Sequence, residues 1–340
     1  MKRSEHFKLR PLWTTALLSL CAVFSVHSFA ALSPVQQAAK ERGITLYNQY
    51  KPAENELRIA AEAGDSEAQF YLGESLRRKN RHMTAEAQEW LETSAKQGNL
   101  YAMVRLSRNR YGLCTVIGNC TKGQKSPEEW LEKAYELASA KAENNDAEAL
   151  YILYWITVDD LPFLVKSAEA GFPLAQYWLA KSYINGEGFF WLPWQRSQEV
   201  ERWFKASAEN GNPKAMIEYA IILHENRGDM AEVRHWIEEA AKTGYQNGVA
   251  HLAGEYAHTP SLFGFPRDLV KAYGLTSLLL VLDGGGGTLR FTQRDIEKLS
   301  AQMTPEQIEQ GKAFALEWQT AYPRPISFFP MRLDPLDSLF

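Results

Sequence analysis

Small and large apolar residues recur along this chain at positions fixed relative to a glycine. The five copies end at Gly64, Gly98, Gly171, Gly211 and Gly244, and small residues stand three and four places before each. Another small residue follows four places after each glycine, and a large aromatic residue stands eight places before four of the five. Apolar positions three and four apart share one face of a helix. The pattern therefore predicts two helices joined at each glycine.

The copies are spaced at the length of one structural repeat. The steps between consecutive glycines are 34, 40 and 33 residues where no copy is missing, which is the length of a helix–turn–helix repeat. In the longer gap Asn145 stands where the glycine is expected. Gly and Asn are the residues that best tolerate the left-handed conformation that ends a helix. We therefore count a further unit there and predict an all-α solenoid.

Small residues form a row on the helices that follow each turn. The row consists of Ala68, Ala102, Ala149, Ala175, Ala215 and Gly248. A Leu stands four residues later in every unit but one, where Tyr219 takes its place. Small residues let two helices approach closely while the larger side chain fills the space beside them. One helix pair cannot bury this surface alone, so the units must stack.

The arrangement, Ala-x-x-x-Leu with a small residue next and Trp…Ala-x-x-Gly, resembles the Sel1-like repeat family, which is related to the tetratricopeptide repeat. The resemblance covers roughly residues 52–282, and the segment from Met303 to Trp318 looks like the closing helix of such proteins. It implies a right-handed α-solenoid with C-terminal capping helices and a role in protein–protein binding. A fold does not name a partner.

The first thirty residues have the features of a leader. Four basic residues come first, Leu12 to Val26 is apolar, and Ser28 and Ala30 are small residues before a cleavage point. The apolar run is shorter than the roughly 20 residues of a membrane span, so a signal peptide fits better than an anchor. We expect export to the periplasm.

The expected organisation follows from the leader and the repeats. It consists of a signal peptide at 1–30, an N-terminal capping helix at 31–51, repeats at 52–288, C-terminal capping helices at 289–320 and an extended tail at 321–340.

Charge and motifs narrow the function classes. Without the leader the chain has 33 basic and 40 acidic residues, a net charge of −7, which argues against nucleic-acid binding. No other stretch is long and apolar enough to cross a membrane, so we expect no stable membrane insertion. The motifs G-x-S-x-G, H-E-x-x-H and G-x-x-x-x-G-K are absent, and the histidines are scattered. We therefore expect a binding protein with no enzyme activity, cofactor or metal.

Candidate contact residues follow from the concave face of tetratricopeptide-like arrays, which the first helix of each unit lines. The resulting positions are Phe70, Glu74, Val104, Arg108, Tyr151, Trp155, Tyr177, Lys181, Ile217, Ile221, Ala250 and Gly254. Tyr151, Trp155 and Tyr177 fall in adjacent units, and aromatic residues with flanking charges are common interface anchors. Aromatic residues at helical spacing are equally typical of a core.

A second candidate surface is the insertion Gly188-Phe-Phe-Trp-Leu-Pro-Trp194. Loops normally face water, so an aromatic loop is unusual. Either the loop folds back over the solenoid or Phe190, Trp191 and Trp194 present an apolar patch to a partner.

Two functions remain open. Secreted Sel1-like proteins of this length are similar to the immunity partners of type VI secretion phospholipase D effectors, which implies a periplasmic inhibitor of a toxin. The alternative is a periplasmic scaffold or regulator that binds a sensor or an envelope enzyme.

We predict that Cys114 and Cys120 form a disulfide in the exported protein. They are the only two cysteines left when the leader is removed, and an oxidising compartment favours their pairing. Mass spectrometry of the non-reduced protein should find the pair linked. Two free thiols would contradict the prediction.

Overall fold

The computed structural model describes residues 31–109, 125–157, 160–259, 261–282 and 287–330. Within these ranges the chain is helical apart from turns, loops and one isolated β-bridge. Leu32 to Phe340 form one compact unit. The expected signal peptide and the expected disulfide between Cys114 and Cys120 lie outside the described residues.

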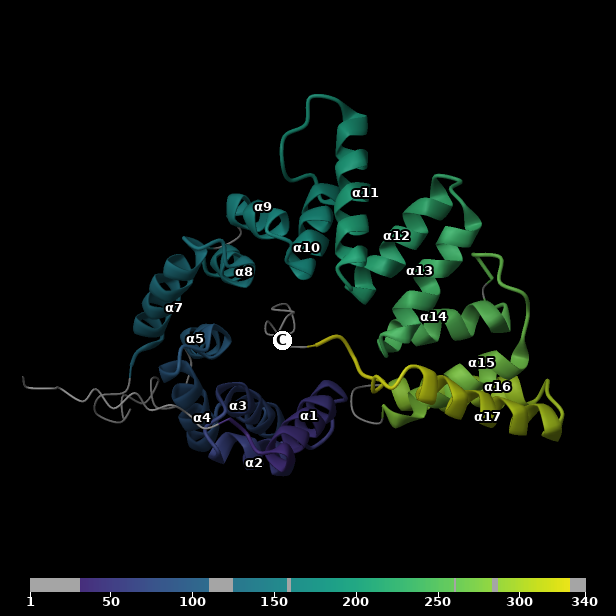
Figure 1. Ribbon diagram of the computed structural model, residues 1–340, viewed down its shortest axis with the longest axis horizontal. Coiled ribbons are helices and arrows are strands. Elements are labelled where there is room, and N and C mark those ends of the chain that lie inside the picture. Colours follow the sequence, from purple (N-terminus) through teal and green to yellow (C-terminus); the bar gives the residue numbers. More distant parts are fainter. Residues whose placement is uncertain (1–30, 110–124, 158–159, 260, 283–286, 331–340) are drawn as a thin grey trace, which may run out of the picture. The chain divides into compact units, whose positions relative to one another are not determined.

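The helices follow one another as a stacked array (Figure 1). The first half contains α1 (Pro34–Asn48), α2 (Glu54–Glu62), α3 (Ser66–Asn80), α4 (Ala85–Lys96), α5 (Leu100–Ser107), α7 (Pro127–Ala142), α8 (Ala147–Ile156) and α9 (Leu161–Glu169). The second half contains α10 (Pro173–Ile184), α11 (Pro193–Glu209), α12 (Pro213–Glu225), α13 (Met230–Lys242), α14 (Gln246–Ala257), α15 (Leu269–Leu278), η1 (Leu279–Val281), α16 (Thr288–Ser300) and α17 (Pro305–Ala321). Each helix from α1 to α15 packs against the next, which confirms the all-α solenoid.

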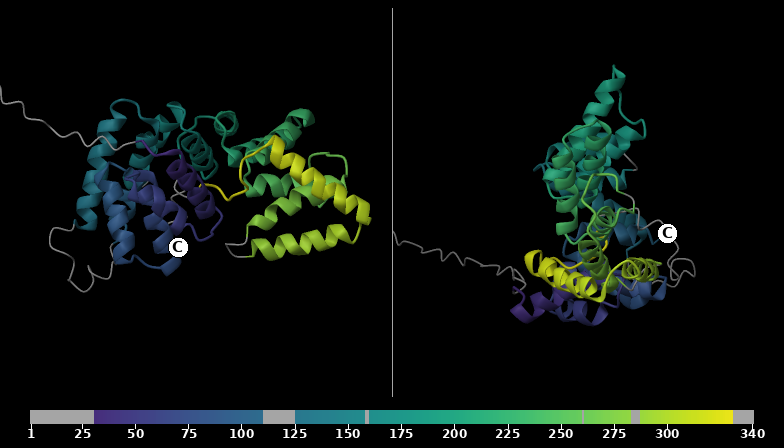
Figure 2. Two further views of the ribbon diagram at one scale, coloured as in Figure 1. Left: turned by 60° about the horizontal axis from the view of Figure 1, so that its bottom comes forward. Right: turned by 90° about the vertical axis from the view of Figure 1, so that its right-hand side faces the viewer.

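The last two helices end the array in a different way. Both α16 and α17 pack against α15 (Figure 2). Gly274 of α15 and Gly311 of α17 allow this close approach, because a Cβ at Gly274 would lie 2.7 Å from the Gly311 carbonyl oxygen. The repeat therefore stops at α15, and a pair of helices covers its exposed face.

Six turns between helices contain a residue with left-handed backbone conformation, at the positions that the sequence pattern indicates. The φ angles are +96° at Gly64, +89° at Gly98, +57° at Asn145, +91° at Gly171, +86° at Gly211 and +78° at Gly244. The substitution of Asn for Gly at position 145 thus preserves the turn, since Asn is the next most tolerant residue. In four of the six, the following Asp or Asn caps the next helix through its side chain.

The row of small residues lies buried where consecutive helices pack together. The five alanines of the row are at most 1% exposed. At the sixth position, Gly248, a Cβ would lie 2.5 Å from the carbonyl oxygen of Ala240 on α13. A small side chain is therefore a steric requirement of this packing.

Buried serines add a polar link within three repeats. The hydroxyls of Ser94, Ser167 and Ser207 donate to the carbonyls of Ser66, Ala147 and Pro173 respectively, at 2.6 Å each. All three serines are fully buried, and each carbonyl belongs to the first turn of the helix that opens the same repeat. The serine in the recurring Ser-Ala-x-x-Gly pattern is therefore a specific hydrogen-bond donor as well as a small residue.

We predict opposite effects for the same substitution at two positions of α14. Gly248→Ala should destabilise the protein by about 1–3 kcal/mol, because the new methyl group collides with backbone. Gly254→Ala should be neutral or stabilise by up to about 1 kcal/mol, since its Cβ would meet nothing closer than Thr259 at 3.6 Å. Urea unfolding of both variants measures the difference. Equal stabilities would contradict the assigned packing.

Candidate functional site

The predicted groove residues differ in how far the structure buries their side chains. Phe70, Glu74, Tyr151, Tyr177 and Ile217 are buried at 9% exposure or less. Trp155, Lys181 and Ile221 are half-buried, and Arg108 is exposed. A buried side chain offers little area to a partner, and these five residues lie in the core of the free chain.

The central aromatics pack mainly against one another. Tyr151 lies 6.0 Å from Trp155, and Trp155 lies 6.2 Å from Trp178 on the next unit, measured between ring centroids. Tyr177 lies 5.5 Å from Trp178 and 5.7 Å from Phe204. These edge-to-face pairs join α8, α10 and α11. Of this cluster, Trp155 and Trp178 are half-buried.

Glu74 is a buried charge with two cationic partners. Arg105 Nε lies 2.9 Å and Arg77 Nε 3.1 Å from its carboxylate. Burial acts to raise the pKa of Glu74, but the two arginines outweigh burial and hold this pKa below its ordinary value. Glu74 therefore joins α3 to α5 within the protein, and sequence spacing could not distinguish this role from a surface contact.

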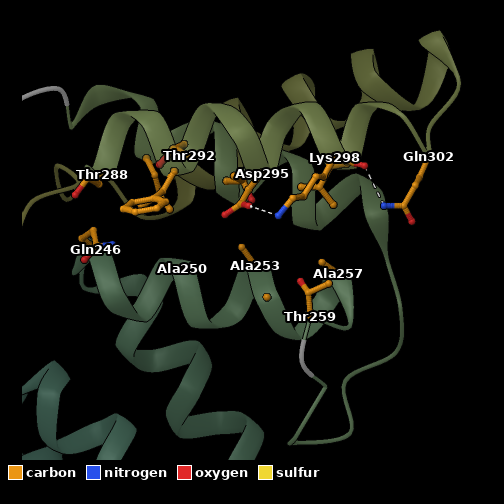
Figure 3. A pocket seen from close by; sticks show the side chains of 15 residues that line it. Gln246, Ala250, Ala253, Ala257, Thr259, Thr288, Thr292, Asp295, Lys298 and Gln302 are labelled. Carbon is orange, nitrogen blue, oxygen red and sulfur yellow. Dashed lines mark hydrogen bonds and ion pairs between the residues drawn. The ribbon is translucent and has the colours of Figure 1, made fainter. Parts of the chain in front are cut away.

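A deep slot opens between α14 and α16, with a volume of about 450 Å³ (Figure 3). One wall is the small-residue face of α14, formed by Ala250, Ala253, Gly254 and Ala257. These residues recur three and four apart, so they share one side of the helix. Ala250 and Gly254 are the positions that the sequence pattern assigns to the groove of the last repeat.

The opposite wall of the slot is more polar. Thr288, Phe291, Thr292, Asp295, Lys298 and Gln302 line it from α16 and the residues after it. Phe291 is 55% exposed, whereas Thr292 and the neighbouring Leu299 are buried. Asp295 and Lys298 form an exposed ion pair at 3.4 Å. The slot thus has one apolar wall of small residues on α14 and a charged edge on α16.

The volume and lining of the slot suit large apolar side chains. Binding pockets commonly enclose about 300–1,000 Å³ and place a few polar groups around an apolar interior. A partner segment that inserts apolar side chains between α14 and α16 would bury the small-residue face. Helix periodicity found only the α14 wall, because α16 lies beyond the last repeat and has no glycine-anchored pattern.

The segment after α17 runs as an extended chain along the turn between α13 and α14. Ser327 pairs with Tyr245 in a parallel β-bridge: the Ser327 amide donates to the Gly244 carbonyl at 3.0 Å, and the Gln246 amide donates to the Ser327 carbonyl at 2.9 Å. Phe329 lies under the Lys214 ammonium at 4.4 Å. A hollow of about 300 Å³ continues from here along the turns at 172–174 and 210–213.

The insertion between α10 and α11 presents its aromatic residues to solvent. Trp191 is 83%, Phe189 76% and Trp194 58% exposed. Phe190 instead packs on Tyr183 at 5.0 Å between ring centroids. Of the two alternatives for this loop, the structure therefore favours the apolar patch.

The described residues contain no group of three or more His, Cys, Asp or Glu side chains arranged to hold a metal ion. In that part of the chain, none of the helices combines the length and apolar character of a membrane span.

Comparisons with known proteins give a limited likeness. Neither a family model nor a curated protein matches the chain. Among solved structures, the chain is similar to a protective antigen of uropathogenic Escherichia coli strains, described as displaying an SLR fold, with 20% identity and a TM-score of 0.47 over 90% of this chain and 64% of that one. It is also similar to a Sel1 repeat protein from Oxalobacter formigenes, with 20% identity and a TM-score of 0.42 over 90% of this chain and 86% of that one. Neither likeness assigns a partner or an activity.

We predict that Arg105→Ala destabilises the protein by about 3–5 kcal/mol at pH 7, because it leaves the buried Glu74 carboxylate short of a cation. The matched change Arg58→Ala should cost less than about 1 kcal/mol, because the Arg58–Glu86 pair is partly exposed.

Acid should reduce the cost of Arg105→Ala. The folded-state pKa of Glu74 is lowered, so its ion pairs stabilise the fold above the unfolded glutamate pKa of about 4.3. This stabilisation is lost as the pH falls through the lower folded-state pKa. Denaturant unfolding at pH 7 and at acid pH measures it. A cost for Arg105→Ala no larger than that for Arg58→Ala at pH 7 would remove Glu74 from this role.

Proposed function

We propose that this chain is a protein-binding solenoid and that the slot between α14 and α16 is its main contact site. The slot carries the proposal, because its α14 wall includes Ala250 and Gly254, the groove positions of the last repeat, and both remain half-buried. A partner that fills it gains apolar burial along Ala250 and Ala257 and meets the charged edge at Asp295 and Lys298.

The turns support binding to a second protein in a separate way. The C-terminal segment lies as an extended chain against Gly244 to Gln246 with two backbone hydrogen bonds. The adjoining hollow, lined by Phe172, Pro173 and Tyr245 among others, is apolar and open. A partner's extended segment could pack along this apolar surface. It would not repeat the backbone pairing made at Gln246, because Pro173 and Pro213 stand at the equivalent positions and have no amide hydrogen to donate.

We further propose that the partner is a toxic phospholipase-type effector, which the chain binds and neutralises in the periplasm. This step rests on the resemblance of the sequence to secreted Sel1-like immunity proteins and on the leader-like first thirty residues. The slot and the half-buried Trp155 supply candidate contact surfaces.

The test is co-expression with an exported phospholipase encoded beside this chain, recognised by its H-x-K-x-x-x-x-D motifs. The exported chain should protect the cells, and the same chain without its leader should not. Gly254→Phe should abolish protection, because its ring would fill the slot, while the control Gly254→Ala should protect. Thermal unfolding confirms that both variants fold.

Trp155→Ala tests the contribution of the central surface in the same assay and should weaken protection. Truncation of a buried interface aromatic costs at least about 2 kcal/mol, or roughly thirtyfold in affinity. If the exported chain neither protects cells nor forms a complex with the neighbouring phospholipase, the immunity function is wrong. A complex with a sensor or an envelope enzyme would then support the scaffold alternative.

A further inference from the structure

The loop between α10 and α11 is held in place by one arginine. The Arg196 guanidinium donates to the carbonyls of Tyr183 at 2.7 Å, Glu187 at 2.6 Å, Gly186 at 3.3 Å and Gly188 at 3.0 Å. Four hydrogen bonds to a charged donor fix the backbone of a segment that has no regular structure. The loop is therefore built to hold a defined conformation.

Two further contacts complete the base of the loop. Phe190 packs edge-on against Tyr183 and lies 4.8 Å from the Arg196 guanidinium. The Leu192 amide donates to the side-chain oxygen of Gln195 at 3.1 Å. With Arg196 and Phe190 turned inward, the remaining large side chains have no place in the core.

The tip of the loop is a cluster of exposed apolar side chains. Phe189, Trp191 and Trp194 are the main members, Leu192 is 39% exposed, and the Phe189 and Trp191 rings lie 5.0 Å apart. Figure 1 shows the loop projecting past the end of α10, beside the first turns of α11. Burial of such rings is strongly favourable, so holding them in water requires a compensating function.

The chemistry of the tip separates a lipid surface from a protein partner. No charged residue lies between Gly188 and Gln195. Glu187 precedes this segment, and Arg196, which follows it, is occupied by backbone carbonyls. Protein interfaces pair about one hydrogen bond with each 100–200 Å² and carry a polar rim. A convex, uncharged tip of Trp, Phe and Leu instead matches the boundary between lipid headgroups and acyl chains, where Trp and Phe are favoured.

We infer that the loop from Phe189 to Trp194 inserts into the interfacial layer of a lipid bilayer and holds the solenoid at a membrane surface. The contact is peripheral and reversible, because only a few side chains enter the lipid. It depends on apolar burial and not on charge. The inference is independent of the proposed function, since it concerns a different surface from the slot.

The test is sedimentation with phosphatidylcholine vesicles, using a chain that begins at Ala31. This chain retains the compact unit from Leu32 and lacks the apolar leader, which would bind lipid by itself. It should bind the vesicles, with equal affinity at low and high salt and with no need for anionic lipid. Trp191→Ser with Trp194→Ser should reduce partitioning by about tenfold or more, because two rings no longer leave water.

The matched control is Tyr135→Ser on α7, an aromatic residue that is 48% exposed away from the loop. It should bind vesicles as the parent does. Vesicle binding that is absent, that requires anionic lipid, or that survives the double substitution would overturn the inference. A protein complex weakened by the double substitution, together with no vesicle binding, would assign the loop to a protein partner instead.

Discussion

The contact between the end of one helix and the start of the next is the constraint on which the rest of the structure depends. A residue with left-handed conformation reverses the chain in each of six turns, and the buried row from Ala68 to Gly248 then allows the two helices to meet closely. At Gly248 the margin is smaller than one methyl group. Because every unit repeats this geometry, each new helix pair stacks on the previous one.

The sequence predicts this repeated geometry well because it is local. Gly64 and its equivalents mark the turns, Asn145 confirms the irregular unit, and the spacing of Ala and Leu gives the buried face. The structure adds the helix caps Asp65 and Asn99, which directly follow two of these glycines. What the sequence could not separate is which large side chains on these helices are core and which are surface.

Tyr151 and Glu74 illustrate why that separation fails. Both stand at groove positions by helical spacing, yet both are buried. Tyr151 packs against Phe172 at the turn into the next unit and against Trp155 of its own helix, and Glu74 pairs with two arginines from α3 and α5. These contacts depend on how adjacent units stack, which no single helix encodes. The slot could not be predicted from the sequence for a related reason, because its second wall comes from α16, which lies outside the repeats. The amino-acid composition identified the aromatic loop. Whether its rings face the solenoid or the solvent depends on the hydrogen bonds of Arg196, which the sequence does not reveal.

The central claim is that the slot between α14 and α16 receives a protein partner. Hydrogen–deuterium exchange of the chain alone and in complex with the neighbouring phospholipase tests this claim most directly. The account predicts slower exchange of the α14 and α16 amides in the complex, with little change in α2 and α4. Protection confined to other helices, with α14 and α16 exchanging as in the free chain, would contradict it.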